Sequence, residues 1–135
     1  MHFSELYREV VDEMASNGKS ARNVELAILD INHAEVGGLL AKQWKFPDVL
    51  INPISFHHDP ASANQDFLRE TLVVHLGNIL AKQMDLGIEH ETESETPVDL
   101  VESYLKLTQD QIARIESNLA QEQTSIIEFL TLLSG

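Results

Sequence analysis

Apolar residues recur at steps of three and four along almost the whole chain, and this spacing most constrains the fold. It is the period of an α-helix that buries one face. The 135 residues suit a single domain with a real core. The sequence therefore predicts an all-α protein, a helical bundle of about six or seven helices. The clearest helix spans about residues 65–86, with an inner face of Leu68, Leu72, His75, Leu76, Ile79 and Gln83, widened by Val73, Leu80 and Met84.

Capping residues and helix breakers divide this pattern into separate helices. Gly18 can take the left-handed conformation that ends a first helix over about residues 4–16. Asn32 and Glu35 have the spacing of a capping box, which predicts a third helix from His33 to about Trp44. The other expected boundaries are Ser20 or Asn23 before a second helix, Pro47 and His57-His58 around a fourth, Pro97 before a short helix, and Thr108 with Gln111 before the last.

Three residues inside these helices work against helix formation. Gly37 and Gly38 each cost about 1 kcal/mol of helix propensity relative to alanine, so we expect a close approach of another backbone to compensate. Pro53 is expected to kink or interrupt the fourth helix, because it lacks the backbone N–H that the helix needs. In the third helix, the residues expected to be buried are Val36, Leu39, Leu40 and Trp44.

The last part of the chain follows an acidic segment. Residues 89–96 contain no aliphatic side chain and predict an exposed loop, and residues 97–135 predict C-terminal helices. The final helix spaces apolar residues seven apart, as in a coiled coil. Because this seam is short, we expect it to dock on its own domain rather than to form a coiled coil. The seam consists of Ile112, Leu119, Ile126 and Leu133, with Ile115 and Phe129 in a second row that Glu122 interrupts.

Charge and composition exclude several functions. The chain carries 22 acidic and 9 basic residues, a formal net charge of -13, and its basic residues form no patch. Phosphate backbones and anionic membrane surfaces repel such a chain, so we expect no nucleic-acid and no membrane partner. No cysteine, secretory signal or long apolar run is present. We therefore expect a cytoplasmic protein.

Four histidines lie on or beside the predicted central helices. His33 begins one helix, His57 and His58 end the next, and His75 lies on an apolar face. Imidazole is the commonest metal ligand in proteins, so His33, His57 and His58 are candidate metal ligands. Neighbouring side chains on a helix point about 100° apart, which argues against His57 and His58 sharing one ion. Each histidine also has a structural explanation, as a partner of a loop, a cap of helix carbonyls or a core residue.

Four ordered segments resemble the second half of an HDOD domain, a relative of the HD and HD-GYP metal-dependent phosphohydrolases. They are Asn32 to Leu40, Trp44 to Pro47, Ile54 to Pro60 and Val74 to Leu80, and we expect residues 1–88 to match the family. The resemblance implies an HD-domain-like helical bundle in a bacterial regulatory setting. It also implies that the catalytic His-Asp pair is missing upstream of His33, and that Asn78 stands where a metal-binding aspartate is expected.

The resemblance favours a non-catalytic HDOD-like module that acts through protein–protein contacts in signal transduction. On this hypothesis the chain has no catalytic residues and no cofactor, and its partner is a signalling protein. The alternative is a metal-dependent phosphohydrolase acting on a nucleotide or cyclic dinucleotide, with Fe, Mn or Zn held by His33, His57 and His58. A third possibility is a structural dimer formed by the C-terminal seam. In each case we expect a homo-oligomer, in particular a dimer.

Overall fold

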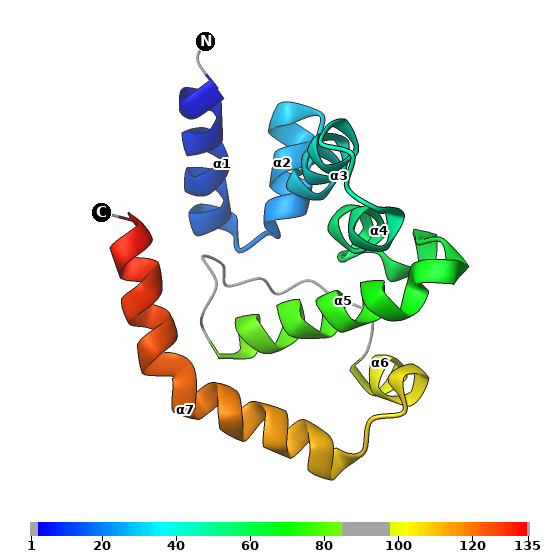
Figure 1. Cartoon of the computed structure of the whole chain (residues 1–135). Helices are drawn as coiled ribbons and strands as arrows, with labels where there is room; N and C mark the ends of the chain where they lie inside the picture. Colours follow the sequence, from blue (N-terminus) through cyan, green and yellow to red (C-terminus); the bar gives the residue numbers. More distant parts are fainter. Residues whose placement is uncertain (1–2, 85–97, 135) are drawn as a thin grey trace.

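Seven α-helices form the part of the chain that the structure, a computed structural model, describes (Figure 1). These residues are 3–84 and 98–134. The all-α prediction and the expected number of helices are confirmed. The helices are α1 (Phe3–Asn17), α2 (Ala21–Leu29), α3 (His33–Gln43), α4 (Asp48–Phe56), α5 (Leu68–Gln83), α6 (Val98–Leu105) and α7 (Gln109–Ser134), with 3-10 turns at Pro60–Ser62 and Gln65–Phe67.

The predicted caps form the expected hydrogen bonds. Gly18 follows α1 with φ of +62°, and its N–H donates to the Met14 carbonyl at 3.0 Å. At the start of α3, the Glu35 N–H donates to Asn32 Oδ1 at 3.0 Å and the Asn32 N–H donates to Glu35 Oε2 at 3.1 Å. Such reciprocal bonds satisfy N–H groups that have no partner within the helix. Ser20 caps α2, and Thr108 with Gln111 caps α7 in the same way as Asn32 with Glu35.

The main apolar cluster lies where α5 meets α6 and the first half of α7. Leu72, Leu76 and Leu80 of α5 are buried there against Val101 of α6 and Ile112 of α7. Leu68, Leu105, Leu107, Ile115 and Leu119 pack around this cluster. The expected docking of the seam on its own domain is therefore confirmed for its first half. Burial of this kind contributes about 25 cal/mol per Å² of apolar surface.

Small residues of α3 face α4, and this close contact explains the two glycines. A Cβ on Gly37 would lie 2.9 Å from Ile54 Cγ2, and one on Gly38 would overlap the Ser55 hydroxyl and lie 3.2 Å from Ser55 Cβ. The glycines do allow a close approach of another helix, but side-chain atoms of α4 and not its backbone make most of the contact. The buried residues of α3 are accordingly Ala34, Gly38 and Ala41.

The predicted inner face of α3 is wrong. Leu39 is 60% exposed and Trp44 64%, and Val36 and Leu40 are also exposed. The tight packing of the small residues places the bulky side chains on the opposite face. A similar correction applies to α5, where Val73 was expected to widen the buried stripe but is 55% exposed. These exposed apolar side chains are the main feature that the helical pattern did not predict.

Two further expectations changed in detail. Pro53 does not interrupt α4, which runs through it from Asp48 to Phe56. The predicted helix over 65–86 begins with a separate 3-10 turn, Gln65–Phe67, before α5 starts at Leu68.

The expected acidic loop at 89–96 lies outside the described residues. Among the described residues, we find no helix with the length and apolarity needed to cross a membrane.

We expect Gly38→Ala to lower the free energy of unfolding by about 1–3 kcal/mol, because the added methyl group forces α3 away from Ser55. Gly77→Ala is the matched control. A Cβ at Gly77 in α5 would meet no atom within 4 Å, so this change should leave stability unchanged or raise it by up to about 1 kcal/mol. Urea denaturation followed by circular dichroism measures both. Equal stability of the two variants would show that α3 and α4 are not closely packed.

Candidate functional site

Three histidines from two helix ends meet in one cluster. His33 is the first residue of α3, and His57 and His58 follow the last residue of α4. One ring nitrogen from each lies within 4.8 Å of the others. Ring centroids are 4.2 Å apart for His57 and His58 and 4.8 Å apart for His33 and His58. His57 and His58 thus both reach the same cluster, although their directions on a helix argued against a shared ion.

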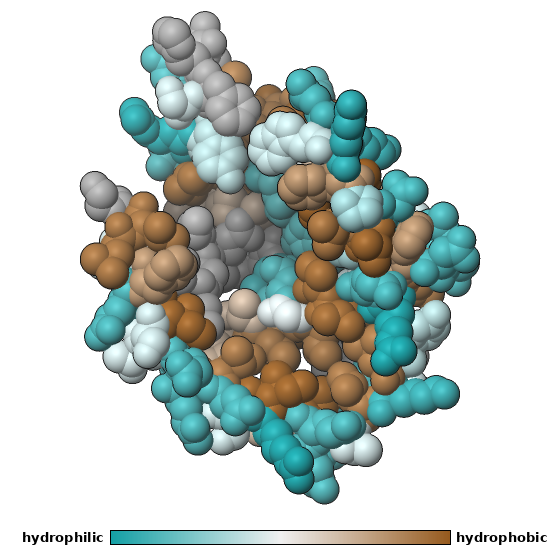
Figure 2. Space-filling view, in the orientation of Figure 1, coloured by the Kyte–Doolittle hydropathy of each residue, from teal (hydrophilic) through white to brown (hydrophobic). Residues whose placement is uncertain are grey.

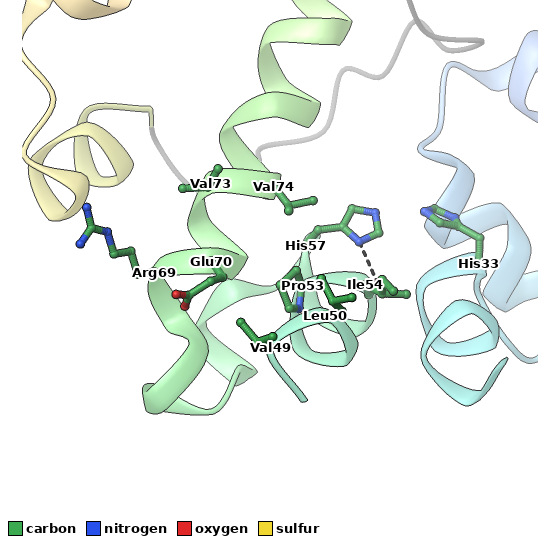
Figure 3. Close-up of a pocket in the computed structure, with 10 residues that line it drawn as sticks. All are labelled: His33, Val49, Leu50, Pro53, Ile54, His57, Arg69, Glu70, Val73 and Val74. Atoms are coloured by element: carbon green, nitrogen blue, oxygen red, sulfur yellow. Dashed lines mark hydrogen bonds between the residues drawn. The ribbon is translucent and has the colours of Figure 1, made fainter. Parts of the chain in front are cut away.

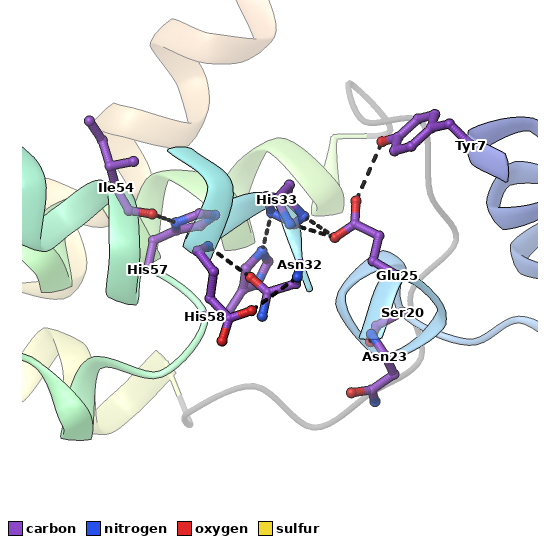
Figure 4. Close-up of polar contacts among 10 residues, drawn as sticks. Tyr7, Ser20, Asn23, Glu25, Asn32, His33, Ile54, His57 and His58 are labelled. Carbon is purple, nitrogen blue, oxygen red and sulfur yellow. Dashed lines mark hydrogen bonds and ion pairs between the residues drawn. The ribbon is translucent and has the colours of Figure 1, made fainter. Parts of the chain in front are cut away.

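The carboxylate of Glu25 in α2 orients His33. Glu25 is 1% exposed, and its Oε2 atom accepts from the His33 backbone N–H at 2.8 Å and lies 2.7 Å from His33 Nδ1. Tyr7 of α1 donates its hydroxyl to Glu25 Oε1 at 3.4 Å (Figure 4). A carboxylate also interacts favourably with the N-terminus of a helix, here that of α3. Glu25 therefore joins three helices and fixes the His33 ring.

A backbone carbonyl contacts the His57 ring, and the His33 ring contacts that of His58. His57 Nδ1 lies 3.0 Å from the Ile54 carbonyl oxygen. This contact leaves Nε2 as the other ring nitrogen of His57. His33 Nε2 and His58 Nε2 are 2.8 Å apart, so one of these atoms donates to the other. When Nδ1 of a neutral His33 donates to Glu25, its Nε2 accepts from His58. The network thus assigns the proton of His33 and of His57 to Nδ1.

His75 supports the turn that carries the pair. It is fully buried on α5, and its Nδ1 atom lies 2.5 Å from the His57 carbonyl oxygen. Its Nε2 atom has no hydrogen-bond partner among the described residues. The structural explanation that the sequence offered for His75 agrees with this position. His75 fixes the backbone at the end of α4 and is not a member of the three-histidine cluster.

The environment of the cluster disfavours protonation. Burial lowers the pKa of His57, and the charge of His33 lowers it further, against the effect of the Ile54 carbonyl. The pKa of His58 falls from 6.5 to about 3, mainly because of burial and then through the charges of His57 and His33. Both rings are therefore neutral at neutral pH. A neutral imidazole has the lone pair that a metal ion or a hydrogen-bond donor requires.

Two cavities lie on either side of His33. The larger, of about 660 Å³, runs between α4 and α5 and ends at His33 and His57 (Figure 3). The smaller, of about 260 Å³, lies between α1, α2 and α3 and includes Tyr7 and Glu25. We call the larger one the α4–α5 groove. Its apolar walls are Val49, Leu50, Pro53, Ile54, Val73 and Val74, and Arg69 and Glu70 also line it.

The cluster fits a single metal ion better than a hydrolytic centre. Three imidazole nitrogens suit a borderline ion such as Zn²⁺, and Glu25 bonded to His33 is the usual second partner of a metal-ligating histidine. A hydrolytic centre also needs carboxylates to balance the charge of the ion. In the described part of the chain, the group found around this point contains histidines alone.

The sequence identified the three histidines but missed Glu25. His33, His57 and His58 were predicted as candidate ligands, and the structure brings all three together. Glu25 gave only a weak signal, because it is one acidic residue in a helix rich in apolar residues. Its role depends on the approach of α2 to the start of α3, and no local pattern encodes that approach. Tyr7, which contacts Glu25 from α1, was missed for the same reason.

The described residues form an all-helical domain in which His33, His57 and His58 lie at helix ends. Residues 1–60 match the family model of the HDOD domain. This match confirms the resemblance to the HDOD domain and includes His33, His57 and His58. The expected boundary at residue 88 stays a prediction.

Comparison with whole proteins adds a relative of this chain. The chain is similar to an uncharacterized protein of Treponema pallidum (strain Nichols), 26% identical over 133 residues that cover 91% of this chain and 25% of that protein. The chain therefore spans about a quarter of the length of this relative. No solved structure gives a significant match.

We expect the free energy of unfolding to fall as the pH drops from 6.5 towards 3 in metal-free buffer. In that interval the unfolded chain binds a proton at position 58, whereas the folded protein keeps His58 neutral. His58→Asn removes the imidazole that takes up this proton. The free energy of unfolding of the wild type, minus that of the variant, should therefore decline across the same interval. Urea denaturation at several pH values measures this difference. A difference independent of pH would show that His58 is not buried in this cluster.

Proposed function

We propose that the chain is a non-catalytic HDOD-type regulatory module that binds a signalling protein in the cytoplasm. The supporting observation is the outward face of α3 and the turn after it, which we call the α3 surface. It consists of the exposed residues Val36, Leu39, Leu40, Trp44 and Phe46. Exposed apolar patches of this kind mark interaction sites.

The composition of the α3 surface suits a protein partner. The rings of Trp44 and Phe46 have centroids 6.1 Å apart, and both rings are exposed. Large aromatic side chains supply most of the binding energy in protein interfaces, because they bury much area with few rotatable bonds. The flanking charges are Lys42, Lys45 and Asp48. The two lysines stand out in a chain with a net charge of -13 and favour a partner with an acidic rim.

The chemistry of the histidine cluster also favours a binding role. A phosphohydrolase requires charge-balancing carboxylates at its metal and cationic groups around the phosphate. The groove beside His33 and His57 has apolar walls, and Arg69 is the cationic residue that lines it. These features suit an apolar contact better than a nucleotide.

A metal-dependent phosphohydrolase is the second candidate, because the three ring nitrogens converge within 4.8 Å. In that case His33, His57 and His58 hold the ion, and Glu25 positions His33. The bound ion would supply an activated water. The cluster does not by itself favour any particular nucleotide.

A site-specific photo-crosslinker at position 44 tests the proposal in the cells that make the protein. We expect a discrete crosslink to a signalling protein, because Trp44 is 64% exposed on the α3 surface. The crosslinker at Gln121 of α7 is the matched control, and it should not give this product. The same crosslink should persist in the His33→Ala and His58→Ala backgrounds, since the proposed contact needs no metal.

Metal analysis of the same protein, purified without added metal, decides for or against the alternative. Stoichiometric Fe, Mn or Zn that is lost in His33→Ala and His58→Ala, together with hydrolysis of a cyclic dinucleotide lost in the same variants, would contradict the non-catalytic proposal. Absence of a crosslink at position 44 would contradict the proposed surface.

A further inference from the structure

The second half of α7 is an apolar helix end without a covering element among the described residues. Ile112, Ile115 and Leu119 of its first half pack on α5 and α6. Beyond them the seam residues Phe129 and Leu133 are 59% and 69% exposed, and the neighbouring Leu132 is 81% exposed. Ile127 is exposed as well. We call residues 126–133 the α7 tip. Figure 1 shows that the tip leads away from α5.

The α4–α5 groove is a receptor of matching character. Its volume of about 660 Å³ is within the range of pockets that bind ligands of drug size. Val73 is 55% exposed, and Val74, Val49 and Leu50 are also exposed along its walls. Figure 2 shows apolar side chains over the end of α7 at the left of the view and over α4 at the right. The tip and the groove of one copy are therefore apart.

Charge makes a second copy an acceptable occupant of the groove. With a net charge of -13, two copies repel one another over most of their surfaces. The tip is an exception, because Glu128 is the one charged residue between positions 123 and 135. The groove is also close to neutral, because Arg69 lies beside Glu70 and the two histidines at its end include the neutral His57. These two surfaces can approach without strong repulsion.

The first half of α7 prevents the tip from reaching its own groove. Contacts of Ile112, Ile115 and Leu119 fix the direction of the helix against α5 and α6. A continuous helix from Gln109 to Ser134 has no break at which the tip could fold back. Among the described residues, the apolar face of the tip is left exposed.

We propose that the α7 tip docks in the α4–α5 groove of a second copy of this chain. An amphipathic helix in an apolar groove is a common binding mode. In a two-fold dimer each copy supplies one tip and one groove, so that both apolar surfaces are buried and the assembly closes. Reciprocal docking doubles the area that a single tip buries. The first half of the α7 seam thus packs in the core, and the second half forms the dimer contact.

Sedimentation equilibrium of the full chain tests this proposal with three variants. Leu133→Glu places a charge on the tip, and Val73→Glu places one in the groove. Because both side chains are exposed in one copy, neither change should unfold the chain, which circular dichroism checks. We expect a wild-type dimer and a loss of affinity of roughly tenfold or more in each variant, since a buried unpaired charge is costly. Gln121→Glu adds the same charge to an exposed position of α7 and should leave the dimer intact.

Mixing the two disruptive variants gives the sharpest result. The intact tip of Val73→Glu and the intact groove of Leu133→Glu still form one contact, so the mixture should produce heterodimers that neither variant forms alone. A dimer that is lost with Leu133→Glu but unaffected by Val73→Glu would show pairing between two tips and overturn the proposal. A monomeric wild type, or a dimer insensitive to both changes, would overturn it as well.

Discussion

The buried carboxylate of Glu25 is the interaction on which the N-terminal half of the fold depends. It accepts hydrogen bonds from the backbone and approaches the ring of His33, and it receives the Tyr7 hydroxyl. A buried charge of this kind is tolerated only when its oxygens have partners. Removing one partner leaves a desolvated group unsatisfied, which costs about 1–3 kcal/mol or more. Glu25 thereby fixes α1, α2 and α3 around the point where α4 ends.

The contacts of Glu25 fix where the His33 ring lies. The position of that ring determines which groups meet at the site. Because Glu25 holds one side of the ring, the other side faces His58, and the end of α4 brings His57 beside them. His75 supports that turn from within α5. The cluster consists of nitrogen donors, and Asn78 on α5 stands where the family resemblance places an aspartate. These features support the proposed binding role. The apolar groove and the α3 surface lie on elements that this junction positions.

The sequence predicted the elements better than their faces. Gly18, Asn32 with Glu35, and Thr108 with Gln111 each act through bonds within a few residues, so their roles could be read locally. His33, His57 and His58 could be named as candidate ligands from the sequence, but their convergence depends on how α3 and α4 pack. The orientation of α3 could not be predicted, because it depends on the close packing of Gly37 and Gly38 against Ile54 and Ser55 of α4, which no local pattern encodes. Glu25 likewise needs two helices to meet before its role appears.

Long-range proton–nitrogen correlation spectra of the imidazole rings at neutral pH test this account most directly. The account predicts that His33 carries a proton on Nδ1, bonded to Glu25, and that His57 carries one on Nδ1, bonded to the Ile54 carbonyl. In Glu25→Gln the His33 signals should move, while those of His57 should change little. An unprotonated Nδ1 on His33 in the wild type would contradict the claim that Glu25 organises the histidine cluster.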